Sequence, residues 1–200
     1  SMAAKPGNTG ATLINSLFKI LKLNNIYLPL KVEKIQQAKK ILNNLNFQGC
    51  SLSMPYKEKL INFVDKLDIN AKKIGSINTI LRKNSKLIGY NTDYYASKKI
   101  LKNQKLSKNY KILILGCGGV AKAILHSLID LKFKKIFLSS RNKYKFNKIN
   151  IKKKITFLEW KNRSKVKFDV IINATPLGMF GNLSNKTPIN ISKKFLPKLI

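Results

Sequence analysis

The chain has 200 residues, 44% of them hydrophobic, which is enough for one large or two small globular domains. Lys and Arg number 40 against 8 Asp and Glu, a net charge of +32, but the lysines are spread along the whole sequence. No zinc-ligand spacing or aromatic repeat indicates a nucleic-acid surface or a metal site. No apolar run approaches the roughly 20 residues of a membrane span, and no segment resembles a secretory signal. Cys50 and Cys117 lie far apart, which fits a reducing compartment. We therefore expect a cytoplasmic protein with neither a membrane nor a specific nucleic acid as partner.

The first half of the chain alternates helices and strands. Apolar residues recur at helical spacing from Leu13 to Leu21 and again from Ile35 to Leu45. No clear strand precedes the first of these helices. The pattern predicts strands at 26–30 (ended by Pro29) and 47–54, a helix at 56–63, a hairpin of strands 76–82 and 87–90, and a helix that begins near Asp93.

Three polar clusters interrupt this half, each at the end of an apolar element. They are Ser51–Lys57, Gly75–Thr79 and Gly89–Asp93. Because α/β proteins place their chemistry at strand ends, these clusters are candidates for a substrate site.

The second half opens with the run KILILGCGG at Lys111–Gly119, followed directly by the helical pattern VAKAILHSL. A buried strand that enters a glycine turn and then a helix favours the binding of a phosphate at the helix N-terminus. Gly116 and Gly118 would let the backbone turn and approach a ligand, while Gly119 and Ala121 would let the helix pack close to the sheet. The alternative is a plain strand-to-helix turn without a ligand.

A second strand is predicted at 134–139, and the residues after it indicate which dinucleotide would bind. An NAD site carries Asp or Glu there for the ribose hydroxyls. This chain has Ser140, Arg141 and Asn142 with Lys143 and Lys145 close behind, and a guanidinium beside ammonium groups suits an extra phosphate. The lysines carry little weight in so basic a chain, but Arg141 favours NADP.

Taken together, the motifs resemble those of the shikimate dehydrogenase family. S-x-P-x-K, I-N-T, Y-N-T-D, G-x-G-G, a basic loop and N-A-T-P-L-G-M (Asn173–Met179) occur in the family's order, from about Pro6 to Met179. The resemblance implies an α/β fold with an N-terminal substrate domain (1–95) and a Rossmann-like NADP-binding domain with a parallel sheet (96–200). It also implies NADP-dependent interconversion of 3-dehydroshikimate and shikimate in aromatic amino acid and chorismate biosynthesis.

Family roles carry over residue by residue. Lys57 and Asp93 match the catalytic pair; the alternatives are a solvated helical lysine and an N-cap for a helix beginning at Tyr94. Ser53, Asn78 and Asn91 match substrate-binding positions, although Asn and Ser are also common in turns. The resemblance assigns cofactor binding to Gly116, Gly118, Gly119, Val120, Ala121, Ser140, Arg141, Asn142, Lys145, Asn173, Thr175, Leu177 and Met179. The single histidine, His126, is interpreted as an incidental surface or packing residue.

Two departures from the family pattern bear on the substrate. Where the family has two serines that hold the substrate carboxylate, this chain has Asn8 and Gly10, which the resemblance assigns to substrate binding. This form is closer to the divergent shikimate dehydrogenase-like paralogues. The family fold also continues beyond Ile200 through another strand and a C-terminal helix that adds a glutamine to the pocket. The alternatives are therefore a quinate/shikimate dehydrogenase-like paralogue of altered substrate and a non-catalytic cofactor-binding module. We expect a monomer or homodimer.

Overall fold

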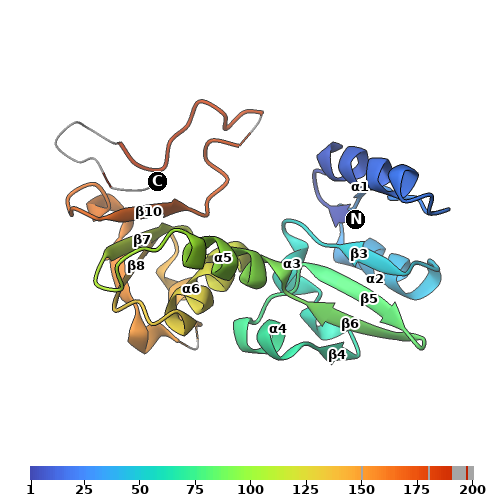
Figure 1. The fold of residues 1–200 in the computed structure, drawn as a ribbon, viewed down its shortest axis with the longest axis horizontal. Coiled ribbons are helices and arrows are strands. Elements are labelled where there is room, and N and C mark those ends of the chain that lie inside the picture. Colours follow the sequence, from blue (N-terminus) through green and yellow to red (C-terminus); the bar gives the residue numbers. More distant parts are fainter. Residues whose placement is uncertain (150, 180, 191–196, 198–200) are drawn as a thin grey trace. The chain divides into compact units, whose positions relative to one another are not determined.

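The computed structural model describes residues 1–149, 151–179, 181–190 and 197, and the chain divides into two compact units, Ser1–Thr92 and Asp93–Ile200 (Figure 1). Each unit has its own sheet and its own buried core. Within the described ranges, no helix is long and apolar enough to cross a membrane.

The first unit is a small α/β unit. Its elements, in chain order, are β1 (Met2–Ala3), α1 (Thr9–Ile20), β2 (Leu30–Lys31), α2 (Ile35–Asn44), β3 (Gly49–Ser51), α3 (Tyr56–Lys59), the 3₁₀ turn η1 (Ile61–Phe63), β4 (Lys66–Leu67), α4 (Ile69–Ile74), β5 (Thr79–Lys83) and β6 (Lys86–Tyr90). The main sheet has the order β3-β5-β6-β4, and β1 and β2 form a separate parallel pair. Only the pairing of β4 with β6 is parallel in the main sheet.

The hairpin β5–β6 confirms the prediction for 76–90, with a later start for its first strand. Lys83 pairs with Lys86, so the loop has two residues, Asn84 and Ser85, both at positive φ (49° and 62°). A two-residue loop with both φ angles positive matches the right-handed twist of the flanking strands, and Asn tolerates that conformation well.

Three predictions for this unit need correction. The strand at 26–30 is reduced to β2, because the Asn15 side chain holds both the N–H (2.7 Å) and the carbonyl (3.0 Å) of Tyr27, leaving neither for a neighbouring strand. The helix at 56–63 ends at Lys59 and resumes as η1, and the strand at 47–54 shortens to β3. The short strand β1, which the sequence did not reveal, is present and buried.

The helix α1 is present where the sequence predicts it, but its apolar stripe is not buried. Leu13, Leu17 and Ile20 are all exposed, and none of its twelve residues is fully buried. The core of the unit is built instead from the other elements, whose buried side chains include Met2, Val32, Leu42, Leu52, Tyr56, Leu60, Ile77 and Ile80.

The second unit is Rossmann-like. Its elements are α5 (Thr92–Asn103, which begins at the boundary), β7 (Lys111–Leu115), α6 (Gly119–Asp130), β8 (Lys135–Ser140), α7 (Lys143–Asn147), η2 (Lys152–Lys154), β9 (Thr156–Glu159), η3 (Trp160–Asn162) and β10 (Val170–Asn173). All pairings in its sheet are parallel, in the order β10-β7-β8-β9. Renumbered within the unit this order is 4-1-2-3, the order of a doubly wound dinucleotide fold read from its fourth strand.

The central strand β7 explains why this sheet is buried on both faces. Ile112 and Ile114 belong to the core that includes α6 residues, whereas Leu113 and Leu115 pack with Phe168 on the opposite face. Successive side chains of a strand alternate between faces, so a strand covered on both sides is apolar throughout. In Figure 1, α5 (green) and α6 (yellow) lie beside this sheet.

Candidate active site and nucleotide-binding turn

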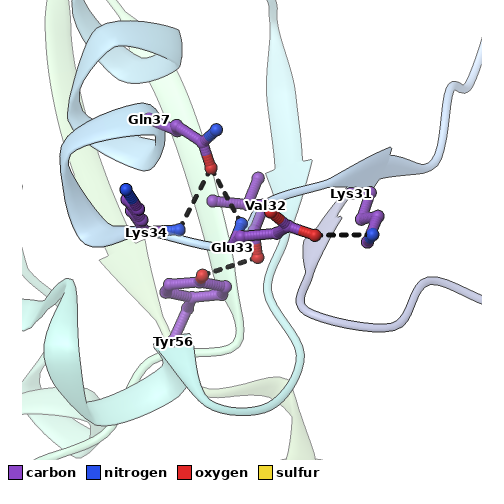
Figure 2. Close-up of polar contacts among 6 residues, drawn as sticks. All are labelled: Lys31, Val32, Glu33, Lys34, Gln37 and Tyr56. Carbon is purple, nitrogen blue, oxygen red and sulfur yellow. Dashed lines mark hydrogen bonds and ion pairs between the residues drawn. The ribbon is translucent and has the colours of Figure 1, made fainter.

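The short helix α3 carries Lys57, and the residue before it fixes the position of that helix. The Tyr56 ring is almost fully buried, and its hydroxyl donates a 2.6 Å hydrogen bond to the carbonyl of Val32. Figure 2 shows this bond reaching from α3 to the segment that leads into α2. Because Tyr56 is locked in the core, the half-buried Lys57 follows it from a fixed backbone.

The acceptor segment is itself held at the start of α2. The Gln37 side-chain oxygen accepts from the N–H groups of Glu33 (2.8 Å) and Lys34 (3.0 Å), which satisfies donors at the helix N-terminus (Figure 2). An exposed ion pair joins Lys31 to Glu33 at 2.6 Å. Exposed pairs contribute little to stability, so the Gln37 cap is the more important restraint.

We predict that Tyr56→Phe lowers the free energy of unfolding by about 1–3 kcal/mol, because the buried Val32 carbonyl loses its partner. Denaturant unfolding measures the change. The matched control is Tyr144→Phe, since that ring is exposed and the substitution should leave the unfolding free energy nearly unchanged. Equal stability of the two variants would show that the Tyr56 hydroxyl does not anchor α3.

Backbone and side-chain hydrogen bonds bring the three polar clusters of the first unit together. The N–H of Ile77 donates to the carbonyl of Lys57 at 2.8 Å. The next residue, Asn78, donates from its side chain to the Thr92 hydroxyl (2.9 Å) and accepts from the Thr92 N–H (2.8 Å). Asn91 is fully buried and donates to the carbonyl of Ser76 at 2.9 Å. The segments around Lys57, Asn78 and Thr92 therefore form one hydrogen-bonded cluster.

Gly75 makes the sharp entry into this cluster possible. It ends α4 in the left-handed conformation, at φ 68°, where a side chain would be strained. The Ser76 hydroxyl that follows is buried without a hydrogen-bond partner in the described structure.

The other predicted substrate residues of this unit are placed differently. Ser53 is exposed, and its carbonyl accepts from the Tyr56 N–H (2.9 Å), so it is the residue that leads into α3. Asn8 and Gly10 lie at the beginning of α1 and are exposed; the Asn8 side chain forms no capping bond. No hydrogen bond between described residues joins Asn8 or Gly10 to the cluster, and their substrate contact stays a prediction.

Asp93 follows Thr92 directly, in the first turn of α5. The helix begins at Thr92, so Asp93 lies inside the helix and is not the N-cap of a helix starting at Tyr94; that alternative is wrong. A carboxylate in the first turn is favoured by the helix dipole. Thr92 lies in the polar cluster Gly89–Asp93, and no role of its own was predicted for it, although a hydroxyl residue at a helix start beside a candidate catalytic carboxylate is a recognisable signal.

In the second unit the glycine turn follows β7 as predicted. Gly116 has φ 108°, and a Cβ there would lie 2.7 Å from the carbonyl oxygen of Ala174. Gly118 is the N-cap of α6 in extended conformation, and a Cβ there would meet nothing within 4 Å. Gly116 is thus required by the fold, whereas the fold has room for a side chain at Gly118. Ala121 is fully buried on α6, as expected for close packing on the sheet.

The basic loop after β8 has its own restraints. The hydroxyl of Ser140 donates to the Asn142 carbonyl (3.0 Å), and the Asn142 side chain caps α7 by accepting from the Lys145 N–H (3.1 Å). Arg141, Lys143 and Lys145 are exposed. The loop therefore has a fixed backbone that presents three cationic side chains to solvent.

The segment after β10 is braced by Asn173. Its side chain accepts from the N–H (2.9 Å) and hydroxyl (2.7 Å) of Thr175 and donates to the carbonyl of Leu177 (2.9 Å). Met179 is about half exposed. The N–H of Ala174 donates to the carbonyl of Leu115, so this loop begins beside the glycine turn. His126 is buried in α6, which agrees with a packing role.

These residues fit a dinucleotide. The carboxyl ends of β7 and β10 lie side by side, which is where the strand order reverses in a doubly wound sheet and where such folds bind nucleotides. Gly118 is the N-cap of α6 and has room around it, and the first N–H groups of a helix have no partner within the helix. The buried hydroxyl of Ser139, whose carbonyl accepts from the Gly116 N–H, has no hydrogen-bond partner in the described structure. Among the described residues, no group of three or more His, Cys, Asp or Glu side chains is arranged to hold a metal ion.

Comparison with known proteins decides the family. A family model for the shikimate dehydrogenase substrate binding domain matches residues 10–80. A solved structure of a shikimate 5-dehydrogenase-like protein is 30% identical, with a TM-score of 0.77 over 94% of this chain and 70% of its own. The chain belongs to the shikimate dehydrogenase family. Its α/β architecture, with a Rossmann-like second unit, is the fold of that family.

Two curated relatives are similar to the chain over most of its length. The shikimate dehydrogenase (NADP(+)) of Clostridium beijerinckii is 40% identical over 179 residues, which is 88% of this chain and 66% of that protein. The shikimate dehydrogenase-like protein of Haemophilus influenzae is 33% identical over 181 residues, 90% of this chain and 66% of that protein. The chain thus spans about two thirds of the length of these relatives.

Proposed function

We propose that the protein is an NADP-dependent oxidoreductase that interconverts 3-dehydroshikimate and shikimate. The observation that carries the proposal is the hydrogen-bonded cluster of the first unit, in which the backbone of Lys57 is tied to Ile77 and Asn78 is tied to Thr92, the residue before Asp93. A family relative named as an NADP(+) enzyme supports the same reaction. Cys50 and Cys117 are both buried thiols, which suits the reducing cytoplasm that we propose as the protein's location.

In the proposed mechanism Lys57 and Asp93 act on the reacting oxygen. Reduction of a ketone leaves an alkoxide that must gain a proton, and the reverse reaction must lose one. The Lys57 ammonium polarises the carbonyl and relays that proton, while the Asp93 carboxylate orients the ammonium. Asn78 and Asn91 hold the backbone on which this pair is carried, and a direct contact of either amide with substrate is a further expectation.

NADP, when bound, accepts or supplies the hydride. Its pyrophosphate is assigned to the turn Gly116–Gly119 and the start of α6, with Val120 and Ala121 completing that turn. The 2′-phosphate is assigned to Arg141, Asn142 and Lys145, with Ser140 holding the loop. The loop braced by Asn173, which contains Thr175, Leu177 and Met179, is assigned to the nicotinamide side.

We predict that NADP binds more tightly than NAD, and that Arg141→Ala reduces the difference between their binding free energies by about 1–3 kcal/mol, the range for charge-assisted hydrogen bonds. Isothermal titration with both cofactors measures this difference. The control is Arg163→Ala, because that guanidinium already donates to the carbonyls of Trp160 and Pro188, so its removal should leave the NADP/NAD ratio unchanged. Equal affinity of the parent protein for both cofactors would contradict the assignment.

A paralogue of altered substrate is the second candidate, because Asn8 and Gly10 stand where the family has two serines for the carboxylate. The likeness to the Haemophilus influenzae shikimate dehydrogenase-like protein supports it. The ratio of kcat/KM for shikimate to that for quinate decides between the two: a ratio well above one favours shikimate dehydrogenase, and a ratio near or below one favours the paralogue.

A further inference from the structure

A cavity of about 800 Å³ lies beside the C-terminal end of α6, within the second unit. Its walls come from α5, from the end of α6 and the residues before β8, and from η2. Four of its seven lining residues are lysines, and the full set is Lys98, Ile129, Asp130, Lys132, Phe133, Lys134 and Lys154.

Asp130 is the only carboxylate among the described residues of the lining, and it is already engaged. The hydroxyl of Tyr94 donates a 2.6 Å hydrogen bond to Asp130, and the ammonium of Lys98 donates to the same hydroxyl at 3.0 Å. The bond to Tyr94 is the main reason that the pKa of Lys98 is raised, so Lys98 is charged at neutral pH and held in place. Among the lining residues that the structure describes, one carboxylate against four ammonium groups leaves three positive charges in excess.

The other three lysines have no carboxylate partner in the part of the chain that the structure describes. Lys132, Lys134 and Lys154 are all exposed and form no ion pair there. Lysines are more numerous in this lining than in those of the other cavities. Among their described residues, the cavities of about 640 and 560 Å³ have no lysine, and those of about 510 and 480 Å³ have two and one.

We propose that this cavity binds a small anion that carries several phosphate groups. Its volume lies within the usual range for small-molecule sites, about 300–1,000 Å³, whereas a nucleic-acid strand needs an extended groove. Lysine binds phosphate as a mobile point charge, so several lysines around one hollow suit a flexible chain of phosphates. The proposal does not depend on the oxidoreductase function.

The cavity is separate from the nucleotide-binding turn. Lys134 precedes β8 and Arg141 follows it, and a strand of six residues spans about 20 Å. The glycine turn follows the carboxyl end of the neighbouring parallel strand, so it lies with Arg141 at the opposite edge of the sheet from Lys134. An alternative is that these lysines only complement the carbonyl groups at the end of α6, which predicts no saturable binding.

The test is calorimetric titration with sodium tripolyphosphate at physiological salt. The parent protein should bind one equivalent saturably, and Lys132→Gln/Lys134→Gln should weaken binding roughly tenfold or more. The charge-matched control is Lys83→Gln/Lys86→Gln in the β5–β6 hairpin, which should change affinity less than about twofold because only diffuse charge is lost. Lys132→Arg/Lys134→Arg should retain binding, and circular dichroism checks that each variant is folded.

Four results would overturn the proposal. One is the absence of saturable binding by the parent protein, and another is an equal loss in the two Gln pairs, which would show unspecific attraction. A loss in Arg141→Ala as large as in the Lys132/Lys134 pair would place the anion at the cofactor loop. Tighter binding of long oligonucleotides than of tripolyphosphate, sensitive to the same pair, would indicate a nucleic-acid surface instead.

Discussion

Lys57→Ala should lower kcat by roughly 10²–10⁴-fold, the usual scale for removing a positioned acid or base, while cofactor affinity changes little. The reason is that the ammonium acts on the oxygen that gains or loses charge during the reaction. Steady-state kinetics on the natural full-length protein, with cofactor titration alongside, measures both quantities. Lys59→Ala is the matched control, because Lys59 is an exposed lysine of the same helix α3 and its removal should leave kcat unchanged.

A variant of Asp93, the proposed partner of Lys57, tests the same mechanism. Asp93→Asn keeps the shape of the side chain but removes the charge, so kcat should also fall heavily. Because the two residues act as a unit, the double variant should lose much less than the product of the two single losses. If Lys57→Ala turned over like the parent and Asp93→Asn only shifted the melting temperature, the pair would be a surface lysine and a helix-terminal charge.

Gly116→Ala should have the largest effect on stability, lowering the free energy of unfolding by about 2–5 kcal/mol. The left-handed backbone at φ 108° strains any side chain, and the new Cβ would lie 2.7 Å from the Ala174 carbonyl oxygen. Gly118→Ala is the matched variant two residues away. Its backbone is ordinary and its Cβ meets open space, so the protein should remain as stable as the parent.

Gly116→Ala and Gly118→Ala together distinguish an effect on folding stability from an effect on NADP binding. Gly118 is the N-cap of α6, where the pyrophosphate is assigned, so the methyl group added in Gly118→Ala should lower NADP affinity although stability does not fall. Denaturant unfolding and cofactor titration give the two readings. Unchanged NADP affinity in Gly118→Ala would show that the cofactor does not approach this helix, and a stable Gly116→Ala protein would contradict the packing at Ala174.

The sequence predicted best where local pattern and tertiary structure agree. The run Lys111–Leu115 is apolar because β7 is covered on both faces, and the glycine cluster ends it because the backbone must reverse beside Ala174. The helices α2, α5 and α6 and the β5–β6 hairpin likewise follow from periodicity and turn residues. The motifs around Lys57, Asn78 and Asn91 were recognisable because each ends an apolar element.

The sequence predicted the structure least well where a residue distant along the chain decides the local conformation. Tyr27 does not pair in a strand because Asn15 occupies its backbone groups, a contact across twelve residues that periodicity does not carry. The role of Thr92 depends on the Asn78 side chain fourteen residues earlier. The lysines of the cavity beside the C-terminal end of α6 come from three separate segments of the chain. Their grouping in space therefore cannot be predicted from a sequence in which lysine occurs throughout.

The most direct test of the central claim is the absorbance of reduced nicotinamide when the natural full-length protein is mixed with shikimate and NADP⁺. The proposed function predicts steady reduction of NADP⁺ with shikimate, much slower reduction with NAD⁺ or with quinate, and loss of the signal in Lys57→Ala. Absence of turnover with every pair of shikimate or quinate and NADP⁺ or NAD⁺, in a protein that still binds NADP, would contradict it.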